Sequence, residues 1–115
     1  SYSLTEIFQQ ILLQGNIELA DNYYDPNFDK ILLFQSLTLL VENNNIESFK
    51  WLSNKIDYND DVSIIILFIT SASVKNDDVY FLNYFYHKYR EIIESNYNIL
   101  LEAIIKSIEK NNKFI

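Results

Sequence analysis

The sequence contains no cysteine, one glycine (Gly15) and one proline (Pro26) in 115 residues. Without cysteine, the chain has no disulfide framework, no thiolate metal site and no cysteine nucleophile. The scarcity of glycine and proline argues against a β-sandwich or a β-barrel, because those folds need many tight turns. It favours helices that are joined by turns of Asn, Asp and Ser.

Long apolar runs are also absent. The longest spans residues 64–69, about a third of the ~18 apolar residues that a membrane-spanning helix needs. The first residues lack a basic region followed by an apolar stretch, so no signal peptide is visible. We therefore expect a soluble intracellular protein in the cytoplasm, with no membrane partner.

Positive charge is scarce. Nine Lys and Arg residues stand against 16 Asp and Glu residues, a net charge of −7, and Arg90 is the only arginine. This balance disfavours binding to nucleic acid, since such binding neutralises phosphates with basic side chains. The sequence also lacks a Ser-His-Asp pattern and a Gly-rich phosphate loop, so we predict no enzymatic activity and no cofactor.

Aromatic residues are abundant, with nine Tyr and eight Phe, and 49% of the chain is hydrophobic. This composition predicts a folded domain with a core rather than a disordered chain.

A short Asn-rich turn followed at once by a large apolar residue recurs four times. The apolar residues are Ile17, Ile46, Val79 and Phe114, separated by 29, 33 and 35 residues. A recurring unit of this length is typical of stacked helical hairpins. We predict an all-α fold, an α-solenoid of about seven helices in a single domain. Its units are residues 3–25, 26–57, 60–95 and 96–115, the last of them incomplete.

Local signals place the helix ends. Ser3 and Glu6 form a capping box, Gly15 suits the left-handed turn that ends a helix, and Asn16 caps the next helix. The pair Asp25-Pro26 predicts a helix start at residue 26.

Three further helices are expected in the second half of the chain. Residues 62–74 are rich in β-branched side chains and also fit a buried strand, but we predict a helix because no other strand is present to pair with it. Residues 79–94 are expected to form one long helix, and residues 97–110 the last one.

One segment resembles a divergent ankyrin repeat. It spans residues 33–57, and its closest part is Asn45-Ile46-Glu47-Ser48-Phe49-Lys50-Trp51-Leu52. Residues 15–19 match the same turn, and residues 76–82 match it loosely. The resemblance implies a non-catalytic protein–protein interaction module. Divergent arrays of this kind are common in viral and protist proteins, where they bind host or cellular proteins.

Candidate contact residues lie on the predicted long helix. Tyr80, Tyr84, His87 and Glu91 form one stripe at helical spacing, opposite a more apolar stripe. Tyrosine is favoured at protein interfaces. The alternative is that both stripes are buried in the core. His87 beside Glu91 could also be read as a metal corner or an acid–base pair, but a solvated side chain explains it equally well.

Trp51, Asp60 and Asp61 complete the candidates. Trp51 is either a core wedge or an interface anchor. The acidic residues either cap a helix or form an edge that docks a basic partner. The alternative function is a small acidic inhibitor whose carboxylates imitate nucleic-acid phosphates. The unfinished hairpin at the C-terminus suggests a fragment of a longer array, or a face for self-association.

Overall fold

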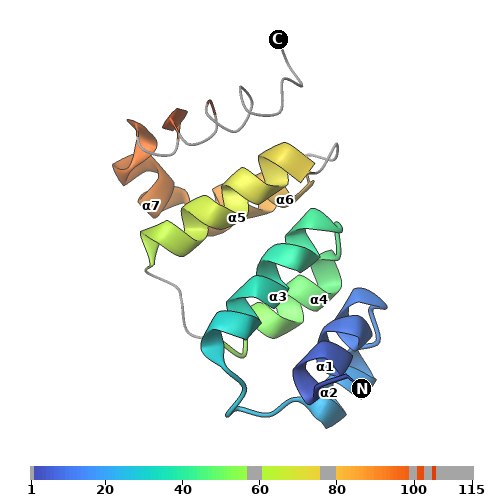
Figure 1. The fold of residues 1–115 in the computed structure, drawn as a ribbon. Coiled ribbons are helices and arrows are strands. Elements are labelled where there is room, and N and C mark those ends of the chain that lie inside the picture. The colour runs from blue at the N-terminus through green and yellow to red at the C-terminus, as the bar shows by residue number, and fades with distance from the viewer. Residues whose placement is uncertain (1, 57–60, 76–79, 99–100, 103–104, 106–115) are drawn as a thin grey trace. The chain divides into compact units, whose positions relative to one another are not determined.

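The computed structural model describes residues 2–56, 61–75, 80–98, 101, 102 and 105, and no strand occurs among them. Figure 1 shows its seven named helices. The predicted all-α class and the predicted number of helices are confirmed. The helices are α1 (Leu4–Leu13), α2 (Ile17–Tyr23), α3 (Lys30–Glu42), α4 (Ile46–Ser53), α5 (Val62–Lys75), α6 (Tyr80–Lys88) and α7 (Arg90–Ser95). The chain divides into two compact units, unit 1 (Ser1–Asp57) and unit 2 (Tyr58–Ile115).

Helices α1 and α2 form hairpin 1 of unit 1, and the predicted signals set its ends. Ser3 accepts a hydrogen bond from the Glu6 amide, as the capping box requires. At the turn, Gly15 has a φ of 76°. The Gly15 amide donates to the Leu12 carbonyl at 2.9 Å, and the Asn16 amide donates to the Ile11 carbonyl at 3.3 Å. These two bonds define a Schellman turn, which satisfies carbonyls at the end of α1.

Helices α3 and α4 form hairpin 2, and its turn repeats that of hairpin 1 at an offset of 29 residues. Asn44, at the position of Gly15, has a φ of 59°. The Asn44 amide donates to the Val41 carbonyl at 3.1 Å, and the Asn45 amide donates to the Leu40 carbonyl at 2.9 Å. The Asn-rich turn of the sequence is therefore one backbone conformation used twice.

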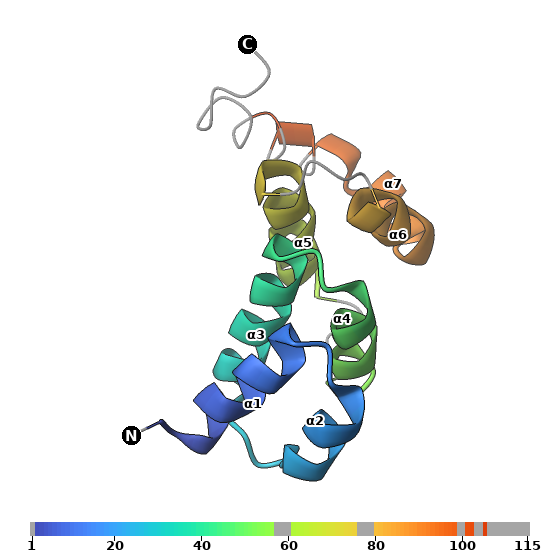
Figure 2. The ribbon, with the colours of Figure 1, turned by 90° about the vertical axis from the view of Figure 1, so that its right-hand side faces the viewer.

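The two hairpins pack against each other within unit 1 (Figure 2). Three side-chain hydrogen bonds join them: Ser48 Oγ to the Leu12 carbonyl (2.6 Å), Asn45 Nδ2 to the Leu13 carbonyl (2.9 Å) and Gln9 Nε2 to Ser36 Oγ (3.0 Å). A hydrogen bond of this kind adds about 0.5–1.5 kcal/mol. Stacking of all four predicted units into a solenoid stays a prediction.

Aromatic rings fill the end of unit 1 away from the turns. The ring of Phe8, which is fully buried, lies 5.3 Å from Phe28, 6.0 Å from Tyr24 and 6.1 Å from Trp51 between centroids. Pairs of this geometry add about 0.5–1.5 kcal/mol beyond the area that they bury. Lys55 covers the outer side of the cluster, with Nζ 5.4 Å from the Trp51 centroid.

The predicted helix start at Asp25-Pro26 is wrong by four residues. Helix α3 begins at Lys30, because Asp29 is its N-cap and accepts a hydrogen bond from the Ile31 amide at 2.8 Å. The Asp25 carboxylate instead accepts from the Asn27 amide and closes a local turn. That turn lets Phe28 fold back into the aromatic cluster, which a continuous helix would not allow.

In unit 2, residues 62–75 are helical, as predicted, and α5 packs on α6. The buried side chains of α5 recur at helical spacing and include Ile65, Phe68, Ile69 and Ala72. The ring of Phe68 stacks on the ring of Phe85 from α6 at 5.8 Å. The core of unit 2 is therefore aromatic, like that of unit 1.

The predicted long helix over residues 79–94 is interrupted at Tyr89. This residue has φ −115° and ψ 29°, so α6 ends at Lys88 and α7 begins at Arg90. The interruption accompanies burial of the Tyr89 ring, which stacks on Phe85 at 6.2 Å. The predicted turn at residues 76–78 lies outside the described residues. Of the predicted last helix, only residues 97, 98, 101, 102 and 105 are described, and each is helical.

The repeated turn predicts unequal effects of substitution. A Cβ added at Gly15 would meet no atom within 4 Å, so Gly15→Ala should cost about 1 kcal/mol through its positive φ alone. Gln14→Ala, one residue earlier with a φ of −80°, should stay within about 0.5 kcal/mol. Urea unfolding measures both, and equal costs would contradict the left-handed turn.

Candidate interaction surface

One face of α6 gathers most of the predicted contact residues. Tyr80, Tyr84 and His87 lie at positions i, i+4 and i+7, which share a face of a helix. The opposite face holds Phe81 and Phe85, both fully buried. Because the core of unit 2 takes up one side of α6, the other side is left with an aromatic and polar character.

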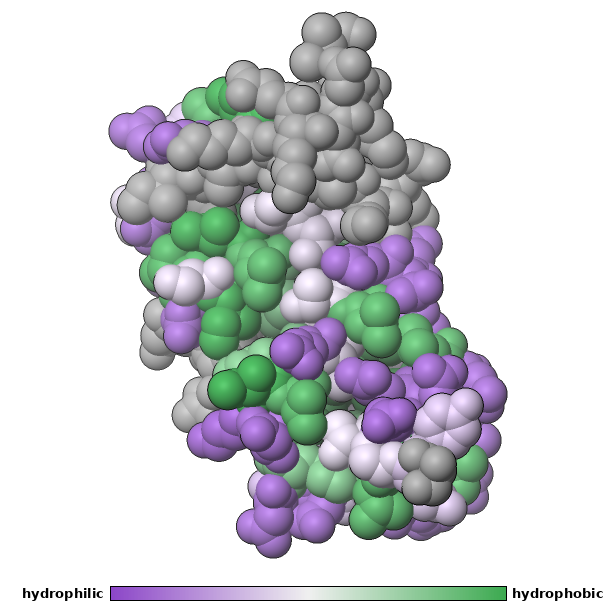
Figure 3. Space-filling model, in the orientation of Figure 1, coloured by the Kyte–Doolittle hydropathy of each residue, from purple (hydrophilic) through white to green (hydrophobic). Residues whose placement is uncertain are grey.

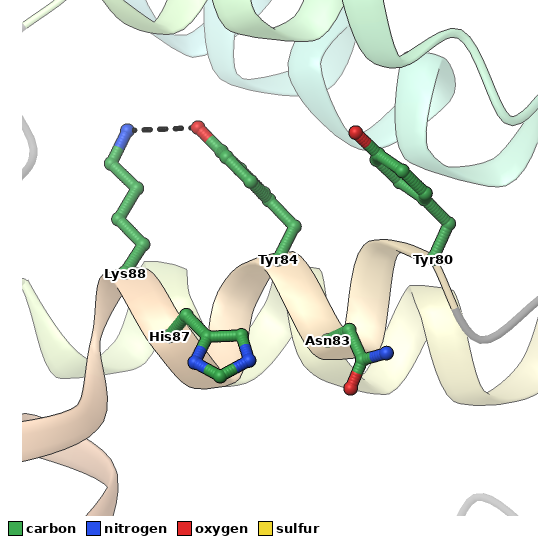
Figure 4. Close-up of a pocket in the computed structure, with 5 residues that line it drawn as sticks. All are labelled: Tyr80, Asn83, Tyr84, His87 and Lys88. Carbon is green, nitrogen blue, oxygen red and sulfur yellow. Dashed lines mark hydrogen bonds between the residues drawn. The ribbon is translucent and has the colours of Figure 1, made fainter.

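This face forms an open groove of about 530 Å³, which we call the α6 groove. It is lined by Tyr80, Asn83, Tyr84, His87 and Lys88. In Figure 4 the side chains of Tyr80, Tyr84 and Lys88 project from the same side of the helix, while Asn83 and His87 lie on the adjoining side. Tyr80 is 47% exposed, and Asn83, His87 and Lys88 are exposed as well.

A cation is held at the C-terminal end of the α6 groove. Lys88 Nζ donates a hydrogen bond to the Tyr84 hydroxyl at 3.2 Å. It also lies 5.5 Å from the Tyr84 centroid and 5.6 Å from the Tyr89 centroid. Interaction with two ring faces restricts where the ammonium group can go. It also favours a fixed orientation for the Tyr84 ring, whose hydroxyl oxygen keeps a second lone pair for another donor.

The stripe that the sequence predicted does not continue past the α6 groove. Glu91 lies in α7, beyond the interruption at Tyr89, and is not part of the groove lining. Its neighbour Arg90 forms an ion pair with Glu94 at 3.1 Å. The hydrogen bond and the charge of Glu94 raise the pKa of Arg90. Both side chains are exposed, so the pair contributes little to stability.

Trp51 belongs to unit 1 and lies in the aromatic cluster around Phe8. It is half-buried, and its ring meets the ring of Tyr24 edge-on at 5.9 Å. Beside it, Lys55 Nζ approaches Asp21 Oδ1 at 3.8 Å. Trp51 thus contributes to packing while part of its ring reaches the surface.

The two acidic candidates are treated differently by the structure. Asp61 Oδ1 accepts hydrogen bonds from the Ser63 amide at 3.0 Å and the Ile64 amide at 3.3 Å. These bonds satisfy free amides at the start of α5, so Asp61 has a capping role. Asp60 lies outside the described residues.

No family model matches the chain, and neither a curated protein nor a solved structure matches it. The ankyrin resemblance therefore stays a prediction that rests on the residues quoted for it.

Other searches of the described ranges add two findings. No group of three or more His, Asp or Glu side chains in them is arranged to hold a metal ion. None of the helices in the described part of the chain has the length and apolarity needed to cross a membrane.

Sequence reasoning missed two members of the α6 groove, Asn83 and Lys88. Their signal was available, since they stand three and eight residues after Tyr80 and so share its helical face. It also missed the contact of Lys55 with Trp51. Lys55 follows the end of α4, where helical spacing gives no guide to the direction of a side chain.

Proposed function

We propose that this chain is a non-catalytic, ankyrin-like helical-hairpin module that binds another protein through the α6 groove. The observation that carries the proposal is the groove itself, in which two tyrosines, a histidine, an asparagine and a lysine converge on one helix face. Tyrosine offers a large contact area with few torsions to restrict, together with a hydroxyl for hydrogen bonding. The in-register hairpins of unit 1 support the same class of function, since hairpin arrays mostly present binding surfaces.

The chemistry of the α6 groove indicates what it would accept. Tyr80 and Tyr84 provide ring faces for an apolar side chain of the partner, and Asn83 provides both a donor and an acceptor. Lys88 adds a positive charge on a chain whose net charge is −7. A partner segment with an apolar anchor and a nearby acceptor or carboxylate fits this set best.

The proposal predicts that the α6 groove can be disabled without unfolding the protein. The double variant Asn83→Ala/His87→Ala alters two exposed groove residues. It should reduce capture of the natural partner at least about tenfold, because hot-spot residues contribute about 1.4 kcal/mol or more each. The measurement is quantitative affinity capture from the natural host, using the full chain as bait.

Tyr86→Ser is the matched control for this experiment. Tyr86 is also an exposed tyrosine of α6, but it does not line the α6 groove, so capture should be unchanged. Melting curves of both variants should overlay that of the parent chain. Unchanged capture by the double variant would exclude the groove as the contact surface.

The alternative function, an acidic inhibitor that imitates nucleic acid, has one observation in its favour. Residues 1–29 contain five acidic residues and neither Lys nor Arg. Such an inhibitor would lose its partner steeply as salt rises from 50 to 200 mM, whereas a contact through tyrosines would change little. Capture at two salt concentrations therefore separates the two functions.

A further inference from the structure

Hairpin 2 has a face that is covered by hairpin 1. Ser36, Asn45 and Ser48 all form hydrogen bonds with hairpin 1 and so mark this face. Leu33 precedes Ser36 by three residues, and Leu52 follows Ser48 by four, so both leucines lie on the same helix faces as those residues. Leu33 is 3% exposed and Leu52 is fully buried.

The residues of hairpin 1 that stand at the same positions, 29 residues earlier, are exposed. Leu4 corresponds to Leu33 and is 64% exposed. Leu19 corresponds to Ser48 and Tyr23 to Leu52, and they are 38% and 43% exposed. We call Leu4, Asn16, Leu19 and Tyr23 the open face of hairpin 1. Figure 3 shows hydrophobic surface among hydrophilic surface at this end of unit 1.

The polar chemistry of the open face also matches that of the covered one. In hairpin 2, Asn45 Nδ2 donates to a carbonyl at the C-terminal end of α1. Its counterpart Asn16 uses Oδ1 to accept from the Leu19 amide at 3.1 Å. Because an Asn side chain also carries two N–H donors, Asn16 Nδ2 can donate to a carbonyl of an added helix in the same way.

Charge indicates which kind of hairpin would fit. Residues 1–29 carry five acidic residues and no basic one, so two open faces brought together would place like charges side by side. The observed contact between hairpins instead pairs opposite charges, with Lys55 of unit 1 reaching back to Asp21 at 3.8 Å. A second copy of this face is therefore a poor occupant, and a basic one is a good occupant.

We propose that the open face of hairpin 1 is a docking site for a helical hairpin of a partner protein. That hairpin stacks on hairpin 1 in the position that hairpin 1 occupies on hairpin 2. Its first helix offers C-terminal carbonyls to Asn16, its edge packs on Leu4, Leu19 and Tyr23, and Lys or Arg residues line its rim. This site is separate from the α6 groove and does not depend on the function proposed for it.

The probe for this site is a hairpin attached to the full chain. A second copy of residues 30–58, fused directly ahead of Ser1, reproduces the spacing of 29 residues between successive hairpins. In the parent chain, Leu4→Ala should change the melting temperature by less than about 2 °C, because Leu4 is exposed. In the extended chain the same exchange should lower it by about 5 °C or more, because Leu4 is then buried.

Ile31→Ala is the matched control. Ile31 is 65% exposed, nearly the same as Leu4, but it lies on hairpin 2 and away from the open face. Its effect on the melting temperature should be equally small in both proteins. If Leu4→Ala stays as mild in the extended chain as in the parent, the open face does not accept a hairpin and the proposal is overturned.

Two further measurements test the choice of occupant. Replacing the three lysines of the added copy by Glu should lower the melting temperature relative to replacing its Glu42 and Glu47 by Lys, and high salt should shrink the difference. Equal melting temperatures would contradict a basic rim. Light scattering should show that the free parent chain is not a dimer held by this face. A dimer that Leu4→Lys dissociates would make a second copy the occupant and overturn the proposal.

Discussion

Phe8→Ala should destabilise unit 1 by about 3–5 kcal/mol, the largest effect that we expect from a single substitution in that unit. Phe8 is fully buried. Its ring lies within 6.1 Å of the rings of Tyr24, Phe28 and Trp51. Its removal therefore leaves a cavity among three aromatic side chains that are fixed to three different segments, so the site has little freedom to collapse.

The fluorescence of Trp51 gives a direct measurement of this effect. It is the only tryptophan of the chain, and its ring is part of the cluster that Phe8 supports. Urea unfolding should show the transition of Phe8→Ala at a much lower concentration than that of the parent. Phe8→Leu, which keeps most of the volume, should cost less than about 1.5 kcal/mol.

Leu4→Ala on the same helix should have little effect, since most of that side chain is exposed. A cost below about 1 kcal/mol for Phe8→Ala would show that the aromatic cluster does not hold unit 1 together.

Phe85→Ala should have a comparable effect on unit 2, again about 3–5 kcal/mol. Phe85 is fully buried and is the centre of the core that joins α5 to α6. Its ring stacks on Phe68 at 5.8 Å and on Tyr89 at 6.2 Å. It also lies 5.6 Å from Tyr84, a residue of the α6 groove. The substitution should thus weaken the core and the binding surface together.

Far-UV circular dichroism follows this loss, because it reports all the helices. The control is Tyr86→Ala, the next residue on the same helix, whose side chain is largely exposed. It should shift the unfolding midpoint by no more than about 0.5 kcal/mol. If both exchanges gave the same midpoint, α6 would not be oriented with Phe85 toward the core.

Comparison of these expectations with the sequence shows which local signals are strong. Ser3, Gly15 and Asn16 determine the ends of hairpin 1 as predicted, because a cap or a left-handed turn depends only on residues within one turn of the helix. Residues 62–75 were correctly predicted to be helical in spite of their β-branched side chains, since a helix buried on one side needs no pairing strand.

The errors occur where packing between distant segments overrides a local signal. Asp25-Pro26 is a good helix start by itself, but burial of Phe28 against Phe8 places the start at Lys30. The helical spacing of residues 79–94 predicts one helix, but the chain turns at Tyr89, whose ring is buried on Phe85. Neither contact can be read from a window of neighbouring residues.

The candidate surface shows the same division. The spacing of Tyr80, Tyr84 and His87 was enough to place them on one face of a helix, because helical periodicity is a property of the sequence alone. Which face of α6 points to the core was decided by α5, through Phe68 and Phe85.

The sequence by itself determined the helical class, the left-handed turns and the 29-residue register of unit 1, because each depends on backbone preferences and periodicity within a few residues. The tertiary structure alone decided that Leu33 is covered while its counterpart Leu4 is exposed. Burial depends on which neighbour occupies a face, and two leucines at equivalent positions of a repeat carry no mark of that neighbour.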